Sequence, residues 1–133
     1  MNGKSRAARI LVIEDNPLNL ELVRDILTAE GYEVLEAADG ASGVALAALE
    51  RPALILMDLQ LPRLDGLEAT RLMRADPRLA GIPILAVTAH AMKGDDDKAR
   101  EAGCDGFITK PIQVREFAAT VADFLKRSKR STE

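Results

Sequence analysis

Residues 53–58 read ALILMD, an apolar run that ends in an aspartate. A short run without polar residues is typical of a strand that helices cover on both faces of a sheet. Comparable runs recur along the chain and alternate with longer segments of helical period, a pattern typical of a parallel α/β sheet. We expect five strands, at Arg9–Ile13, Glu33–Glu36, Ala53–Met57, Ile84–Thr88 and Gly106–Thr109.

The segments between and after these strands predict helices. The first begins after Asn16, with Pro17 at its first position, and stops at Gly31. We expect it to bury Leu18, Leu22, Ile26 and Leu27. The last helix has an apolar face formed by Val114, Phe117, Ala118, Val121, Phe124 and Leu125. Further helices are expected at Ala41–Leu49, Leu67–Ala75 and Ala91–Ala102, the last weakened by Gly94 and a run of acids.

Length and composition indicate one soluble domain. The chain has 133 residues, 47% of them apolar, which is enough for one self-sufficient core. We expect this domain at 9–126, between a flexible N-terminal segment, 1–8, and a flexible C-terminal tail, 127–133. No stretch approaches the roughly 20 apolar residues of a membrane span.

Charge and cysteine content narrow the classes of partner and compartment. The net charge of -3 provides no general attraction to nucleic acid or to anionic membranes, so we expect neither as a partner. The lone Cys104 cannot form an internal disulfide. A reducing, cytoplasmic location is therefore predicted.

Polar residues stand where four of the predicted strands end. Strand one runs into Glu14 and Asp15, strand three into Asp58, strand four ends at Thr88, and strand five runs into Lys110. Ligands of open parallel sheets bind beyond the carboxyl ends of the strands. These five side chains therefore predict a shared site.

The chemistry of such a site follows from its charges. Three clustered carboxylates repel one another unless a cation neutralises them, and Mg²⁺ prefers oxygen ligands while leaving positions for water and a phosphate oxygen. A carboxylate can also act as a nucleophile and form an acyl phosphate, whose oxygens an ammonium group stabilises. Asp58 and Lys110 fit these two roles.

Taken singly, each residue has a plainer interpretation. Asp58 or Thr88 could cap a helix, and Glu14 and Asp15 could interact with the dipole of the first helix. Lys110 could be a surface lysine. Their joint placement at strands one, three, four and five is what favours a shared site.

Three stretches of the chain together resemble the receiver domains of two-component response regulators. They are VIEDNPLNLELV at 12–23, LILMDLQLPRLDGLEATRLMR at 54–74 and PILAVTAHAMKGDDDKAREAGCDGFITKPI at 83–112. The resemblance extends from about Ala8 to Lys126 and implies a single doubly wound, flavodoxin-like (βα)5 sheet of strand order 2-1-3-4-5. The chain is most similar to single-domain regulators of the DivK type and to receivers of hybrid histidine kinases, from which it could be an excised piece.

The resemblance also implies roles for particular residues. Asp58 would take a phosphoryl group from a histidine kinase or histidine phosphotransfer protein. Mg²⁺ or Mn²⁺ would bind Asp15 and Asp58 directly, Glu14 through a water, and the main-chain carbonyl of Gln60. Lys110 would hold phosphoryl oxygens.

Other positions would respond to the phosphoryl group or tune its lifetime. Thr88 would hold phosphoryl oxygens and form a switch with Phe107, although Phe107 could equally be an ordinary core residue of its strand. Gln60 and His90 would tune hydrolysis. The resemblance further implies a cis Lys110–Pro111 bond and backbone roles for Gly66 and Gly103. The readout would be binding to a downstream protein by a monomer or weak dimer.

Three rival functions remain. An aspartyl phosphatase of the haloacid-dehalogenase type needs a second Asp two positions after its nucleophile, where this chain has Gln60. A flavodoxin-like cofactor binder needs a phosphate loop after strand one, where Glu14 and Asp15 would repel phosphate. An unphosphorylated scaffold would usually lack some of the acids or the lysine. We therefore expect a signalling switch rather than an enzyme.

Overall fold

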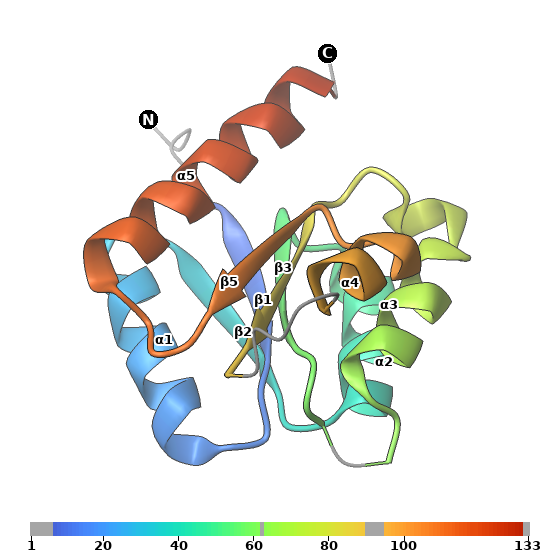
Figure 1. Ribbon diagram of the computed structural model, residues 1–133. Coiled ribbons are helices and arrows are strands. Elements are labelled where there is room, and N and C mark those ends of the chain that lie inside the picture. Colours follow the sequence, from blue (N-terminus) through green and yellow to red (C-terminus); the bar gives the residue numbers. More distant parts are fainter. Residues whose placement is uncertain (1–6, 62, 90–94, 132–133) are drawn as a thin grey trace.

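Apolar residues on both faces of the central strands produce a five-stranded parallel sheet in the computed structural model, which describes residues 7–61, 63–89 and 95–131 (Figure 1). The order β2-β1-β3-β4-β5 confirms the predicted fold. All five residues of β3 and of β4 are buried. The strands are β1 (Arg9–Ile13), β2 (Glu33–Ala37), β3 (Leu54–Asp58), β4 (Ile84–Thr88) and β5 (Gly106–Thr109).

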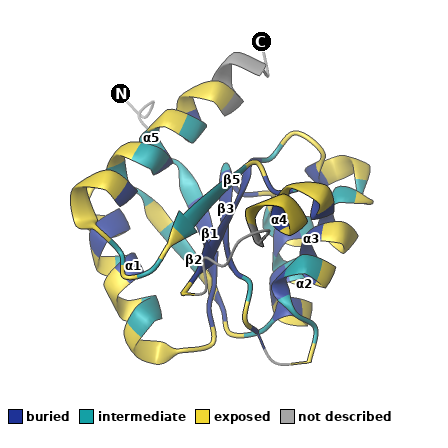
Figure 2. Ribbon diagram, in the orientation of Figure 1, coloured by how far each residue is buried: buried dark blue, intermediate teal, exposed yellow. Residues whose placement is uncertain are grey.

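Helices cover both faces of the sheet. On one face lie α1 (Pro17–Ala29) and α5 (Val114–Ser131); on the other lie α2 (Gly40–Glu50), α3 (Gly66–Arg74) and α4 (Asp95–Ala102) (Figure 1). A short 3₁₀ helix, η1 (Pro77–Leu79), which the sequence did not predict, follows α3. Each face has its own apolar core, and the central strands β1, β3 and β4 between the two cores are the most buried part of the described chain (Figure 2).

The first helix buries two of the four residues predicted, Ile26 and Leu27, but not Leu18 or Leu22. Val23, Ile26 and Leu27 are buried, whereas Leu18 is 75% and Leu22 is 42% exposed. At 100° per residue, Leu18 and Leu22 lie on the flank of α1 that faces away from Val23 and Leu27. The prediction for these two leucines was wrong because two overlapping apolar stripes are present and only one contacts the sheet.

The last helix is longer than predicted. It continues to Ser131, so 127–131 are helical where the sequence indicated a flexible tail. Arg127 pairs with Asp123 one turn earlier at 3.0 Å and lies 4.5 Å above the ring of Phe124, and 127–131 contain neither Gly nor Pro. Val114, at the start of the helix, is 54% exposed rather than part of its apolar face.

Two arginines satisfy carbonyl groups at the edge of the sheet where the strands begin. Arg9 donates to the main-chain carbonyl of Glu50, the last residue of α2. Arg74 donates to the carbonyls of Gly103 and Ile82, at 2.8 Å each, and pairs with Asp105. Because helices end with unpaired carbonyls, these guanidinium groups act as built-in caps.

Both ends of the described chain lie at this same edge. Ala7 and Ala8, before β1, line one surface hollow together with Leu125 and Lys126 of α5. Within the described ranges, no helix is long and apolar enough to cross a membrane.

Candidate functional site

The register of the sheet brings the predicted polar residues to one edge. Ile13, the last residue of β1, pairs with Met57, and Asp58 pairs with Val87, so Glu14, just after β1, lies beside Asp58 at the end of the neighbouring β3. Asp58 is the last residue of β3 rather than the first residue after it. Glu14 and Asp58 are only 4% and 5% exposed, which is unusual for carboxylates.

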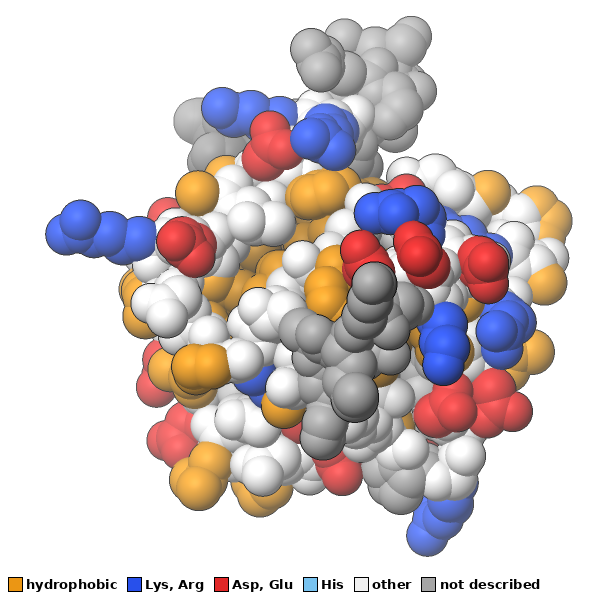
Figure 3. Space-filling view, in the orientation of Figure 1, with side chains coloured by type: hydrophobic (Ala, Val, Ile, Leu, Met, Phe, Trp, Pro, Cys, Tyr) orange, Lys and Arg blue, Asp and Glu red, His pale blue; other side chains and the backbone are white. Residues whose placement is uncertain are grey.

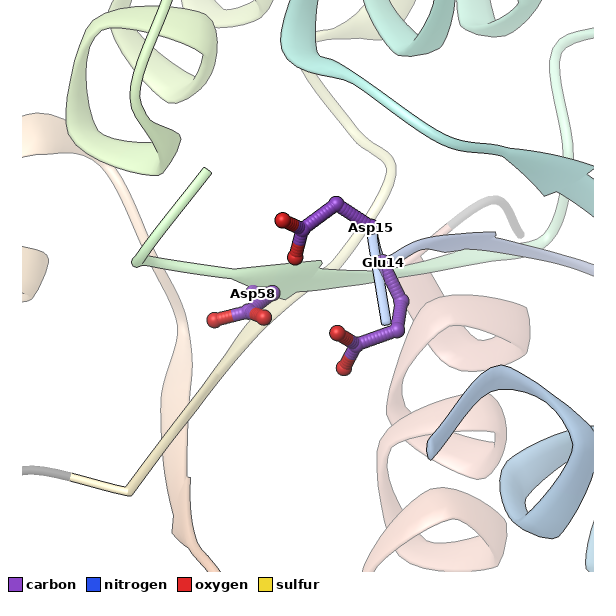
Figure 4. Close-up of side chains that lie close together, drawn as sticks. All are labelled: Glu14, Asp15 and Asp58. Carbon is purple, nitrogen blue, oxygen red and sulfur yellow. The ribbon is translucent and has the colours of Figure 1, made fainter. Parts of the chain in front are cut away.

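The three carboxyl groups gather at the ends of β1 and β3 (Figure 4). Glu14, Asp15 and Asp58 each offer an oxygen that lies within 4.8 Å of the others, and Asp15 is the exposed member. The cluster combines two buried acids with one that solvent can reach. Asp15 is therefore the acid of the cluster that is exposed to solvent.

Lys110 supplies a positive charge to this cluster from the end of β5. Its Nζ lies 3.0 Å from Oε1 of Glu14 and 3.4 Å from Oδ2 of Asp58. Its main-chain N–H donates to the carbonyl of Thr88 at 2.8 Å, which fixes the start of the loop after β5. The cis Lys110–Pro111 bond implied by the resemblance is present.

Burial and proximity shift the pKa values of two groups in the site. Burial raises the pKa of Glu14, and the neighbouring Asp58 raises it further. Burial alone would lower the pKa of Lys110, but its hydrogen bond to Glu14 and the charge of Asp58 outweigh that effect and raise it. The ammonium of Lys110 thus pairs with two of the three carboxylates of the cluster, which leaves these four groups with an excess of acids over cations.

This donor set fits a divalent cation of the magnesium type. The donors are carboxylate oxygens from the ends of two neighbouring strands, two of the acids are buried, and among the described residues the cation paired with them is Lys110. Mg²⁺ and Mn²⁺ favour such oxygen ligands, and the cluster that the described residues form contains neither thiolate nor imidazole donors. The cluster could therefore bind such an ion.

The loop after β3 shapes the site through its backbone. The N–H of Gln60 donates to Oδ1 of Asp58 at 2.9 Å and orients that carboxylate. Gly66, at the start of α3, packs so closely that a β carbon there would lie 2.5 Å from the carbonyl oxygen of Asp58. The sequence indicated a turn role for Gly66 but gave no sign of this contact.

Asn16 caps α1, as the sequence predicted, and also makes a contact with the site that the sequence did not predict. Its main-chain N–H donates to Oε2 of Glu14 at 3.1 Å, and its side-chain oxygen accepts from the N–H groups of Leu18 and Asn19. The Asn-Pro pair marked it as a helix cap. Only the folded loop shows that the same residue touches an acid of the site.

The remaining predicted residues are placed as follows. Thr88 ends β4, is 2% exposed and pairs in register with Thr109. Phe107 is half-buried in β5 and packs against the core on the α4 side. Gly103 ends α4 with φ +118°, a conformation that favours glycine. The predicted tuning residue His90, and residues 91–94 of the expected fourth helix, lie outside the described residues.

The surface in Figure 3 carries mixed charge. Basic and acidic side chains of the described residues lie beside one another on this face rather than in separate patches (Figure 3). Several form ion pairs, among them Arg100 with Asp97 at 3.6 Å.

Comparison with known proteins agrees with this geometry. The family model described as the response regulator receiver domain matches residues 10–122. The polar-differentiation response regulator DivK of Brucella anthropi is 46% identical over 116 residues, which are 87% of this chain and 94% of that protein. DivK of Brucella ovis is 45% identical over the same shares of the two chains.

Solved structures agree as well. The receiver domain of the sensor histidine kinase PA1611 from Pseudomonas aeruginosa, with a magnesium ion coordinated in its active-site cleft, has a TM-score of 0.85 and 36% identity, covering 91% of this chain and 99% of that one. The chemotaxis protein CheY4 of Vibrio cholerae has a TM-score of 0.85 and 26% identity, covering 90% and 99%. The chain therefore belongs to the response regulator receiver domain family of two-component signalling.

Proposed function

We propose that Asp58 is the phosphoacceptor of this receiver domain. The observation that carries the proposal is a carboxylate only 5% exposed at the end of β3, 3.4 Å from the ammonium of Lys110 and grouped with Glu14 and Asp15. A buried acid in this setting has a nucleophilic oxygen, a counter-charge and a possible metal site side by side. The phosphoryl donor is a phosphohistidine of a histidine kinase or histidine phosphotransfer protein.

The transfer step follows from these positions. A carboxylate oxygen of Asp58 forms a bond to phosphorus while the bond from phosphorus to the donor imidazole nitrogen breaks. The imidazole leaves as a neutral ring after it takes a proton from solvent. Lys110 stabilises the negative charge on the transferring oxygens, and the N–H of Gln60 holds Oδ1 of Asp58 in place.

The ligands of the cation follow the same scheme. Asp15, Asp58 and the main-chain carbonyl of Gln60 would hold Mg²⁺ or Mn²⁺ directly, and Glu14 would contribute through a water. When bound, the ion neutralises charge on the acids and on the phosphoryl oxygens. The all-oxygen cluster and its excess of negative charge support this assignment.

The response to phosphorylation rests on Thr88 and Phe107. The hydroxyl of Thr88 moves toward the phosphoryl oxygens and Phe107 turns inward into the space that becomes available, which favours an active conformation already present in the ensemble. The surface of α4, β5 and α5 then binds a downstream protein. In this scheme the chain acts as a signalling switch, and its only chemistry is its own phosphorylation and dephosphorylation.

A small-molecule phosphodonor tests the assignment without a cognate kinase. Wild-type protein incubated with phosphoramidate and Mg²⁺ should gain one phosphoryl group, measured by intact mass, that is stable in acid and lost in base. Asp58→Asn should gain none, and Asp25→Asn, a matched change on α1, should behave like the wild type. A wild-type protein that stays unmodified and does not bind beryllofluoride would support the scaffold function instead.

A further inference from the structure

Glu14 is held at both of its carboxylate oxygens. Lys110 donates to Oε1 at 3.0 Å, and the main-chain N–H of Asn16 donates to Oε2 at 3.1 Å. The lysine comes from β5, whereas Asn16 belongs to the same loop as Glu14. The hydrogen bond from the Asn16 N–H to Glu14 therefore depends on the conformation of residues 14–16.

That conformation is fixed by the side chain of Asn16. Its Oδ1 accepts from the N–H of Leu18 at 2.9 Å and of Asn19 at 3.2 Å, and its own carbonyl accepts from Leu20 at 2.9 Å. Pro17 follows directly and restricts the backbone further. The cap thus ties the acidic loop to the first turn of α1.

Asp15 lies between these two fixed points. Its neighbour Glu14 is anchored to β2 through its N–H, which donates to the carbonyl of Ala37 at 3.0 Å, and Asn16 is anchored to α1. With both neighbours held, the backbone at Asp15 has little freedom, although its side chain is exposed. Glu14 and Asn16 therefore determine the direction in which the side chain of Asp15 leaves the backbone.

We propose that Asn16 is a positioning residue for the divalent-cation site, acting on Glu14 through its amide and on Asp15 through the cap of α1. The inference rests on the metal site of the proposed function. According to this proposal, the side chain of Asn16 affects metal affinity, whereas a helix-capping residue that does not contact the acids has no such effect.

Binding of Mn²⁺ alone, followed by electron paramagnetic resonance of the free ion, tests this role without phosphorylation. Asn16→Ala should weaken Mn²⁺ binding about three- to tenfold, less than the roughly 10–100-fold typical of residues that bond directly to a metal ligand through their side chains, because the main-chain amide of residue 16 is retained. Asn16→Ser keeps an oxygen that can cap the helix and should bind Mn²⁺ within about twofold of the wild type.

Asp39→Ala provides the matched control, because Asp39 caps α2 by accepting from the N–H of Ser42 at 2.8 Å. It should lower the melting temperature by about 3–6 °C, as Asn16→Ala does, and leave Mn²⁺ affinity unchanged. If Asn16→Ala folds poorly, Asn16→Gly, which retains most of the capping stability, should still show the weaker binding.

The outcomes separate the two proposals. Unchanged Mn²⁺ affinity in Asn16→Ala or Asn16→Gly would overturn the role of Asn16, as would an equal loss of affinity in Asp39→Ala. A failure of Asn16→Ser to recover affinity would also overturn it. Wild-type protein that binds no Mn²⁺ would overturn the metal site itself, and with it the positioning role.

Discussion

Lys110 Nζ lies closer to Glu14 than to Asp58, at 3.0 Å against 3.4 Å. The ammonium of Lys110 is therefore shared between two buried carboxylates, one just after β1 and the other at the end of β3. Because the ammonium is shared, a change at either acid alters the ion pair that Lys110 forms with the other acid. The side chain of Lys110 therefore affects both the stability of the fold and the position of the Asp58 carboxylate.

Lys110→Met tests this link, because it removes the charge and keeps the length. Without divalent ions, Glu14 and Asp58 lose their common cation, and the free energy of unfolding in urea should fall by about 3 kcal/mol. Added Mg²⁺ should restore part of the loss. Lys98→Met, at an exposed position of α4, should change stability by less than about 0.5 kcal/mol. Equal stability of the two variants would contradict the shared role.

Glu14 predicts a pH dependence. Its pKa is raised by burial and by Asp58, so the folded state favours the protonated acid. The stability gained in this way is fully present below the pKa of the unfolded chain and is lost as pH rises through the raised folded pKa. In EDTA, the stability of wild type relative to Glu14→Gln should therefore decrease with pH across that window. Urea titrations at several pH values measure it, and an increase would refute the assignment.

Gly66→Ala should disturb the phosphoacceptor directly. The new methyl group would lie 2.5 Å from the carbonyl oxygen of Asp58 and 2.6 Å from Cα of Leu59, so the loop must shift. We expect phosphorylation by phosphoramidate to slow by about tenfold or more, since small misplacements of a reacting group are costly. Gly81→Ala is the control, because nothing lies within 4 Å of a β carbon there. Similar rates for both variants would show that the close approach is unimportant.

Arg74→Lys should destabilise the fold without abolishing phosphorylation. A lysine keeps the charge but cannot reach Gly103, Ile82 and Asp105 together, so we expect a loss of about 2–4 kcal/mol in urea. Arg78→Lys changes a more exposed pair with Asp76 and should cost less than about 1 kcal/mol. An equal cost for the two substitutions would argue against the role of Arg74 as a cap.

The strands and the acid cluster could be predicted because both depend on local pattern and on one rule of topology. Apolar runs mark strands whatever surrounds them, and parallel strands bring their carboxyl ends to one edge, so Glu14, Asp15 and Asp58 could be grouped before any contact was known. The chemistry of Asp58 and Lys110 could be inferred from the clustered charges, whereas the strand order and the roles of the switch and tuning residues came from the resemblance.

Features that depend on packing between distant segments could not be predicted. The α1 sequence offers two apolar stripes, and only contact with the sheet selects Val23 over Leu18. Arg74 is an ordinary helical arginine until the fold brings Gly103 and Asp105 beside it. The amide of Asn16 belongs to every residue type except proline, so no sequence pattern could reveal its contact with Glu14.

Both ends of the described chain lie at the edge of the sheet opposite Asp58 (Figure 1), where Arg9 and Leu125 line one surface hollow. This arrangement makes the domain modular. A fluorescent protein or a second folded unit joined to either end would stand away from the acids and leave the approach of a phosphohistidine clear. The same geometry suits attachment to a surface through either end, so a biosensor or an immobilised form can be built without redesigning the site.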